Sequence, residues 1–267
     1  MKKDGLVECL KDSGIFLLIA LVFMVSLSSI FFLFGIEISK FHLSWSLIMS
    51  SIPFYLLNRK KILSSLIISI CLAFFVLLLS IGVNSMYLDL SWDGNTYHKD
   101  AVGLLKNGWN PIYEEYIETY EKLGNRDMNY IGDKIDKTHG FWQTYYAKGT
   151  WLIGSSIYSF TDDIETGKAY NLLVNYISFV LLLSLLYKFG CSFLISILIS
   201  FVFAFNPIII AQMFTYYNDG FLGNLLMLLI FYMMIFTLVC WQNFLFFLPL
   251  ILSSLHTHYP PFAILTV

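Results

Sequence analysis

The chain has 267 residues, of which 58% are hydrophobic and 13% are charged, and its formal net charge is −2. Soluble domains usually carry about 25% charged residues, so this composition excludes an ordinary soluble domain and indicates an integral membrane protein. No basic stripe runs along the sequence, which argues against a nucleic-acid partner. The four cysteines have the spacing of neither a disulfide framework nor a zinc site.

The first part of the chain predicts three transmembrane spans. The first apolar run has no small-residue cleavage site after it, so we interpret it as a retained span and not as a signal peptide. The second run is short and contains Pro53, which membrane helices tolerate. The three predicted spans cover residues 15–36, 43–57 and 62–83.

A large polar region covers residues 84–168, and apolar runs resume after it. Four further spans are predicted at residues 169–187, 192–213, 221–240 and 244–255. The chain ends within a new apolar run, so we expect it to be the N-terminal portion of a longer protein. The sequence therefore predicts an all-α polytopic integral membrane protein with about seven transmembrane helices. Its parts are spans 1–3 (1–83), one large external loop with interfacial helices (84–168), and spans 4–7 with the start of a further apolar segment (169–267).

Basic residues predict the orientation, because they favour the cytoplasmic side of a membrane. They precede the first span, follow the second at Arg59-Lys60-Lys61, and follow the fourth at Lys188. The predicted spans place all three groups on one side, so we expect a cell-membrane protein with a cytoplasmic N-terminus. The loop 84–168 and the polar segments 215–220 and 256–259 then share the extracytoplasmic side.

The first end of the external loop predicts a short helix over residues 97–106. Asn95 or Thr96 is expected to cap its start, and Asn107-Gly108 to end it. Apolar residues gather on one side, which is typical of a helix in the membrane interface. Asp93 would lie just before this helix, where the helix dipole favours an anion.

The second end of the loop predicts another interfacial helix. Here Lys148-Gly149 precedes the apolar stretch 151–160, and Asp162 and Asp163 separate that stretch from the fourth span.

Four pieces follow one another on the predicted external side. They are Asp93 with Tyr97-His98, then Gly108-Trp109-Asn110-Pro111, then Tyr146-Ala147-Lys148-Gly149 with Trp151, and finally Tyr217-Asn218-Asp219. In this order they resemble the GT-C superfamily of polytopic membrane glycosyltransferases, which includes protein mannosyltransferases and lipid A aminoarabinose transferases. The resemblance implies that an acid in the first large external loop acts as base. It also implies a sugar on a polyprenyl phosphate as donor.

Two acids are the catalytic candidates. Glycosyl transfer needs a carboxylate that takes the proton of the acceptor hydroxyl, and Asp93 is our candidate for this general base. Asp219 is the only acid after Lys168 and is the second candidate. The alternative for each is an acid that caps a helix.

The substrate-binding candidates are mostly aromatic or basic. His98 is expected to bind the donor phosphate as a cation or to pair with Asp93, and Lys148 to contact the phosphate. An ordinary interfacial histidine and a snorkelling lysine are the alternatives. The remaining candidates are Tyr97, Trp109, Tyr217 and His258, although aromatic belts at the membrane surface also explain exposed tryptophans.

No cofactor is predicted. His256 and His258 form an H-x-H pair that could join Asp93 and Asp219 around a divalent metal. These side chains lack the fixed ligand spacing of a metal site.

The predicted activity is therefore the transfer of a sugar from a polyprenyl-phosphate donor to a glycan, lipid or protein acceptor outside the cytoplasm. Three alternatives stay open. A transporter would place its ionisable residues near the middle of the membrane. A non-catalytic subunit of a cell-envelope assembly would tolerate Asp93→Asn together with Asp219→Asn. A polysaccharide polymerase would depend more on basic external residues than on Asp93.

Overall fold

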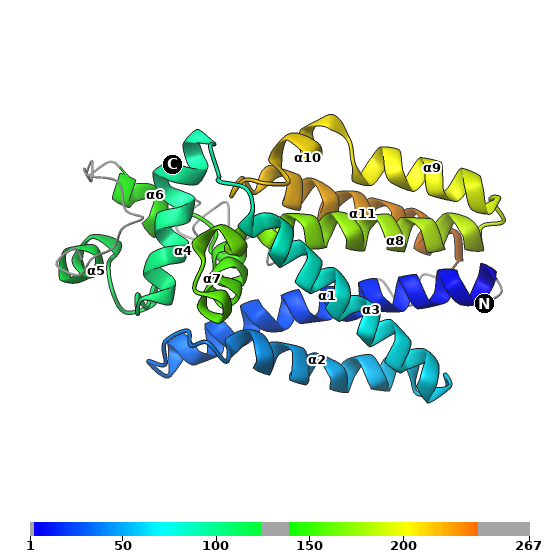
Figure 1. The fold of residues 1–267 in the computed structure, drawn as a ribbon, viewed down its shortest axis with the longest axis horizontal. Coiled ribbons are helices and arrows are strands. Elements are labelled where there is room, and N and C mark those ends of the chain that lie inside the picture. Colours follow the sequence, from blue (N-terminus) through cyan, green and yellow to red (C-terminus); the bar gives the residue numbers. More distant parts are fainter. Residues whose placement is uncertain (1–2, 124–138, 240–267) are drawn as a thin grey trace, which may run out of the picture.

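The computed structural model describes residues 3–123 and 139–239, and every regular element in these ranges is a helix. Long helices lie side by side in a bundle, and shorter helices form a smaller part at one end of it (Figure 1). The bundle contains α1 (Lys3–Leu33), α2 (His42–Asn58), α3 (Leu63–Ser85), α8 (Tyr170–Lys188), α9 (Phe193–Ala204), α10 (Pro207–Gln212) and α11 (Asp219–Val239).

The smaller part is built from the polar region between α3 and α8. Its elements are the π-helix η1 (Gly94–His98), α4 (Lys99–Lys106), α5 (Tyr116–Leu123), α6 (His139–Tyr145), α7 (Gly149–Thr161) and the 3-10 helix η2 (Ile164–Ala169). The segment α7 packs against α4 and η2, and η2 packs against α3, so this part is joined to the bundle.

Three helical stretches are long and apolar enough to cross a membrane. They cover Lys3–Leu33, Leu63–Ser85 and Ile164–Lys188. Phe193–Ala204 and Asp219–Met233 are apolar but shorter. The predicted all-helical fold is thus confirmed for the described residues, and the three apolar helices agree with the predicted membrane location by length and composition. The predicted span over 244–255 lies outside them, and the count of seven spans stays a prediction.

The fifth predicted span, 192–213, is not one helix. α9 ends at Ala204, and a separate short helix, α10, starts at Pro207. Asn206 causes the new start, because its Oδ1 accepts hydrogen bonds from the backbone N–H groups of Ile208 (3.1 Å) and Ile209 (3.2 Å). Pro207 has no N–H to donate and suits the first position of a helix. The sequence prediction missed this break because the hydropathy is uniformly high across it.

The first helix begins twelve residues before the predicted span, and charged contacts explain its extension. Asp12 is fully buried, and its carboxylate accepts a hydrogen bond from Lys61 Nζ at 2.5 Å. Glu8 contacts Lys11 at 2.6 Å, Lys61 at 3.1 Å and Lys188 at 3.5 Å. The basic groups that the sequence placed on one side of the membrane therefore meet at one end of the bundle.

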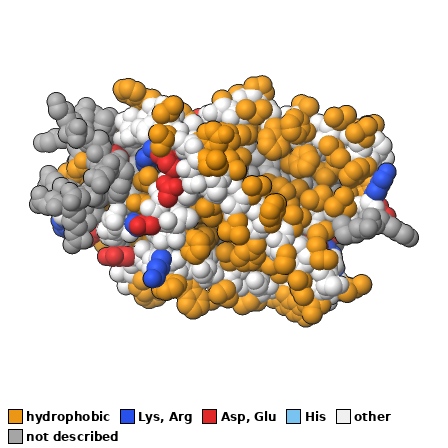
Figure 2. Space-filling model, in the orientation of Figure 1, with side chains coloured by type: hydrophobic (Ala, Val, Ile, Leu, Met, Phe, Trp, Pro, Cys, Tyr) orange, Lys and Arg blue, Asp and Glu red, His pale blue; other side chains and the backbone are white. Residues whose placement is uncertain are grey.

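The bundle core and its outer surface differ in character. Gly14 lets α1 and α8 approach closely, because a Cβ atom there would lie 2.5 Å from Val180. Ser13 Oγ and Tyr176 OH, 2.6 Å apart, form a hydrogen bond between the same two helices. Large hydrophobic side chains such as Ile67, Phe75 and Leu198 are instead exposed. Figure 2 shows hydrophobic side chains covering the bundle and charged ones gathered toward its ends, as expected for a surface in contact with lipid.

Candidate functional site at one end of the bundle

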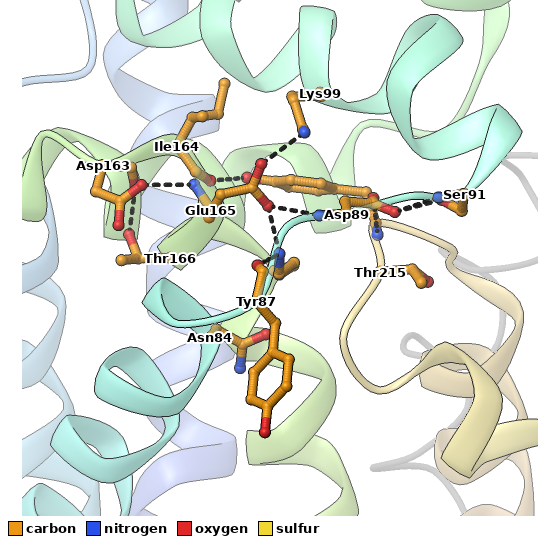
Figure 3. Close-up of polar contacts among 12 residues, drawn as sticks. Asn84, Tyr87, Asp89, Ser91, Lys99, Asp163, Ile164, Glu165, Thr166 and Thr215 are labelled. Carbon is orange, nitrogen blue, oxygen red and sulfur yellow. Dashed lines mark hydrogen bonds and ion pairs between the residues drawn. The ribbon is translucent and has the colours of Figure 1, made fainter.

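A buried ion-pair network joins the polar region to the bundle (Figure 3). Glu165 of η2 lies at its centre, with one carboxylate oxygen 2.6 Å from Lys99 Nζ and the other bonded to Lys168 Nζ. The second oxygen also accepts the backbone N–H of Asp89 at 3.0 Å. Lys168 is fully buried and donates as well to the carbonyl oxygen of Tyr87. Each buried charge here has a partner, which is the condition for burying it at all.

Asp89 extends this network to a late loop, residues 213–218. Its Oδ1 accepts from both the backbone N–H and the hydroxyl of Ser91, at 2.8 and 2.6 Å. Its Oδ2 accepts from the backbone N–H of Tyr216 at 2.7 Å. The Tyr87 ring also stacks on Phe214, with centroids 4.7 Å apart. The segment that leaves α3 is therefore fixed against the loop that precedes α11.

The start of the predicted loop helix differs from expectation. Helical backbone already includes Asp93, so Asp93 does not stand before the helix as a separate anion. Neither Asn95 nor Thr96 caps the helix. Asn95 donates to the carbonyl oxygens of Asp89 and Ser91, and Thr96 donates to that of Trp92. Helical backbone already starts at Trp92, so both side chains reach the carbonyl oxygen four residues earlier, and neither stands at the helix start.

The predicted end of this helix is confirmed. Gly108 has φ +103°, a left-handed conformation, and the Trp109 N–H bonds to the Leu104 carbonyl oxygen at 2.9 Å. We predicted that this helix lies in the membrane interface, but α4 is enclosed by protein. Residues Lys99 to Leu105 are all buried, and the helix packs against α7 and η2. The ion pair with Glu165 makes it possible to bury the charged side chain of Lys99 in this helix.

Five aromatic or imidazole rings gather where η1, α6 and α7 meet. The Tyr97 ring lies 6.2 Å from Trp142 and 5.5 Å from Tyr146, and the Tyr146 ring stacks on Trp151 at 6.3 Å. The His98 ring is 5.7 Å from Trp151. We call Tyr97, His98, Trp142, Tyr146 and Trp151 the aromatic cluster. Its outer members Trp142 and Tyr146 are exposed, whereas Trp151 is fully buried.

Asp93 borders the aromatic cluster through Tyr97. Burial, followed by hydrogen bonds with Tyr146 and Asp93, raises the pKa of Tyr97 far above its ordinary value. Tyr97 therefore stays protonated near neutral pH, and Asp93 is half-buried beside it. The structure thus brings together two of the predicted site residues from one segment.

His98 does not pair with Asp93. Its Nδ1 accepts a hydrogen bond from Trp151 Nε1 at 2.7 Å, and the amide nitrogen of Asn218 lies 3.4 Å from the same atom. Burial lowers the pKa of His98 to about 4. The imidazole is therefore uncharged near pH 7, and the prediction that it binds a phosphate as a cation does not fit this environment.

Lys148 lies near two tryptophan rings. Its Nζ is 6.0 Å from the Trp151 ring centroid and 5.8 Å from that of Trp109. It donates to the carbonyl oxygens of Thr144 and Tyr146, at 2.9 and 3.3 Å, and burial lowers its pKa. An ammonium group has three N–H donors, so one is left for an anion.

Trp109 itself is buried and donates from Nε1 to the Glu114 carbonyl oxygen, so it serves as a wall and not as an open stacking surface.

The remaining predicted residues lie on or beyond the late loop. Asp219 is exposed at the first position of α11, and its carboxylate accepts from Gln212 Nε2 at 3.3 Å. The expected N-terminal position on this helix is confirmed. Tyr217 is half-buried, and its carbonyl oxygen accepts from Asn171 Nδ2 at 3.2 Å. Asn218, which neighbours both, is the residue of this loop that contacts the aromatic cluster. His256 and His258 lie outside the described residues.

Sequence reasoning missed the network residues Asp89, Lys99, Glu165 and Lys168. The sequence signal that could have found them is their position next to the apolar spans, because charged side chains there need partners. Among residues 3–123 and 139–239, no group of three or more His, Cys, Asp or Glu side chains is arranged to hold a metal ion.

No protein-family model, curated protein or solved structure matches this chain in sequence or fold comparisons.

Proposed function

We propose that this chain is a membrane glycosyltransferase that moves a sugar from a polyprenyl-phosphate donor to an extracytoplasmic acceptor. One observation carries the proposal. Segments far apart in the sequence, those of Asp93–His98, Lys148–Trp151 and Asn218, converge on one aromatic cluster at one end of an apolar bundle. An acid, a cation and aromatic surfaces at such a place match the needs of a reaction on a sugar carried by a lipid.

In this proposal Asp93 is the general base. A carboxylate beside Tyr97 at the edge of the cluster can take the proton from an acceptor hydroxyl as that oxygen attacks the anomeric carbon. The bond from the anomeric carbon to the phosphate oxygen breaks, and the lipid phosphate leaves. Lys148 stabilises the phosphate with its remaining N–H, while Asp219 and Tyr217 border the acceptor side.

The proposed topology has seven spans, a cytoplasmic N-terminus and the site outside the cytoplasm. Its support is the meeting of Lys11, Lys61 and Lys188 around Glu8 at the end of the bundle where the N-terminus lies (Figure 1). Basic clusters of this kind favour the cytoplasmic side. The smaller part of the molecule lies at the other end of the bundle.

The test is the fate of a labelled sugar. Membrane vesicles that contain the protein receive polyprenyl phosphate carrying a radiolabelled hexose, and the label is followed from the lipid fraction into glycan, protein or other lipids. Asp93→Asn should lower transfer by about 10²- to 10⁴-fold, the usual contribution of a general base. Glu118→Gln, which removes an exposed acid of α5, is the matched control and should transfer normally. Normal transfer by Asp93→Asn at equal protein level would remove the mechanism.

A further inference from the structure

The contact between Trp151 and His98 fixes which imidazole nitrogen carries the proton. An indole Nε1–H can only donate, so the nitrogen that receives it, Nδ1 of His98, has no hydrogen. In an uncharged imidazole the proton then lies on Nε2. We infer that His98 is an uncharged hydrogen-bond donor to the sugar of the lipid donor, acting through Nε2–H. This inference rests on the proposed function and names the part of the substrate that His98 binds.

A second contact supports the same tautomer. The Asn218 side-chain oxygen accepts from Tyr170 OH at 3.0 Å, so the Asn218 amide nitrogen is the atom that faces His98. That nitrogen is also a donor, and it lies 3.4 Å from Nδ1. Nδ1 has one in-plane lone pair, which accepts the short bond from Trp151, and the Asn218 amide lies near the same atom at the longer distance. A proton on Nδ1 would leave the Trp151 Nε1–H without its acceptor.

Nε2 of His98 is left for a ligand. Both hydrogen bonds given by described residues to the His98 ring involve Nδ1 and leave Nε2–H to point elsewhere, although the residue as a whole is 2% exposed. The rings around His98 are those of Tyr97 at 4.3 Å, Trp151 at 5.7 Å and Tyr146 at 6.1 Å. Tyr146 is exposed at the edge of this group, so the group borders the protein surface.

These surroundings favour a carbohydrate over a phosphate as the partner of Nε2–H. Ligand sites typically combine apolar and aromatic walls with a few placed polar groups, and a sugar ring presents C–H faces and hydroxyl oxygens. A phosphate is bound best by a charged donor, and the nearby charged donor is Lys148, over the Trp151 ring. Trp151 thus contacts both a charged donor, Lys148, and an uncharged one, His98.

The experiment compares two lipids that differ only in the sugar. The full-length chain, held in nanodiscs of zwitterionic phospholipid, is offered polyprenyl monophosphate and the same lipid carrying glucose, mannose or N-acetylglucosamine. Native mass spectrometry gives the ratio of sugar-bearing to sugar-free lipid bound. His98→Phe keeps a ring but removes the donor. His98→Gln keeps an uncharged N–H near the position of Nε2. Lys148→Met removes the cation.

We expect the unaltered protein to prefer at least one sugar-bearing lipid by about three- to ten-fold, the range for one hydrogen bond between uncharged groups. His98→Phe should lose this preference and still bind the sugar-free lipid, and His98→Gln should keep most of it. Lys148→Met should weaken both lipids alike. A preference that survives in His98→Phe, or equal weakening of both lipids by it, would overturn the inference while leaving the proposed function standing. Binding of neither polyprenyl lipid above phospholipid would overturn the proposed function and the inference together.

Discussion

The carboxylate of Asp89 accepts the backbone N–H of Tyr216 at 2.7 Å across 127 positions of the sequence. The same side chain accepts two hydrogen bonds from Ser91, two residues before Asp93. Asp89 thus ties the segment of the proposed base to the loop of Asn218. It is a positioning residue, because its carboxylate holds Ser91 and Tyr216 in place through three hydrogen bonds.

Asp89→Ala should destabilise the protein and loosen the late loop. It leaves three donors without their acceptor, and hydrogen bonds to a charged group contribute about 1.5–3 kcal/mol each before relaxation. We expect a loss of at least about 2 kcal/mol in unfolding by sodium dodecyl sulfate titration in mixed micelles. Glu118→Ala, an exposed acid, should change little. Equal stability of the two variants would show that the Asp89 bonds are not maintained in solution.

Glu165→Gln should be among the most damaging single changes. It leaves Lys99 and Lys168 buried without a carboxylate, and breaking a buried ion pair costs about 3–5 kcal/mol. Asp162→Asn breaks the pair with Lys106 at the surface, where Asp162 is 82% exposed, and should cost about 0–1 kcal/mol. A double variant, Glu165→Gln with Lys99→Met, should recover part of the loss. Strictly additive losses in the double-mutant cycle would contradict coupling between these two residues.

Gly94→Ala should disturb the Asp89 turn directly. A Cβ atom at this position would lie 2.1 Å from Asp89 Oδ2 and 2.2 Å from Ser91 Oγ, far inside contact distance. The turn must shift, and the bond to Tyr216 weakens with it. Gly82→Ala meets open space within α3 and should stabilise by up to about 1 kcal/mol through helix propensity. Thermal unfolding of the two variants in detergent compares them, and a stabilised Gly94→Ala would contradict the described geometry.

Asp100 predicts a pH-dependent stability. Burial raises its pKa from 3.8 to about 7, against a smaller lowering by Lys99. The folded state then binds this proton more tightly than the unfolded state. The contribution of Asp100 to the free energy of unfolding is therefore complete below pH 3.8 and is lost as pH rises toward 7. Between these pH values the free energy of unfolding falls by about 1.4 kcal/mol per pH unit.

The measurement is the stability difference between the unaltered protein and Asp100→Asn from pH 5 to pH 8. This difference removes contributions common to both, including that of His98, whose lowered pKa acts in the opposite direction at acid pH. The unaltered protein should lose stability relative to Asp100→Asn as pH rises. A difference that does not change with pH would refute the raised pKa.

The sequence predicted what local patterns determine. Long apolar runs gave α1, α2, α3, α8 and α11 with ends that mostly agree within a few residues, because burial in lipid and helix length act within one segment. The stop at Gly108 followed from the left-handed conformation that glycine adopts easily. The helix break before Pro207 also has a local sequence signal, an asparagine followed by a proline, but a prediction from hydropathy alone did not detect it.

The partners of charged side chains could not be predicted in this way. Lys99 and Glu165 are 66 positions apart, and Trp151 and His98 are 53 apart, so no local pattern connects them. The sequence predicted a positively charged His98 in the site, because the burial that lowers its pKa arises only from tertiary packing. It also favoured Asp219 over Asn218, although Asn218 is the residue that contacts His98.

The ion pairs around Glu165 have a practical consequence for protein production. Residues 94–161 make up most of the polar region, and one might try to express them by themselves in water. Cutting there would leave Lys99 without Glu165 and would uncover the side of α7 that packs on η2. Such a fragment should aggregate, and antigens or crystallisation targets made from this protein should therefore keep the helices on both sides of the segment.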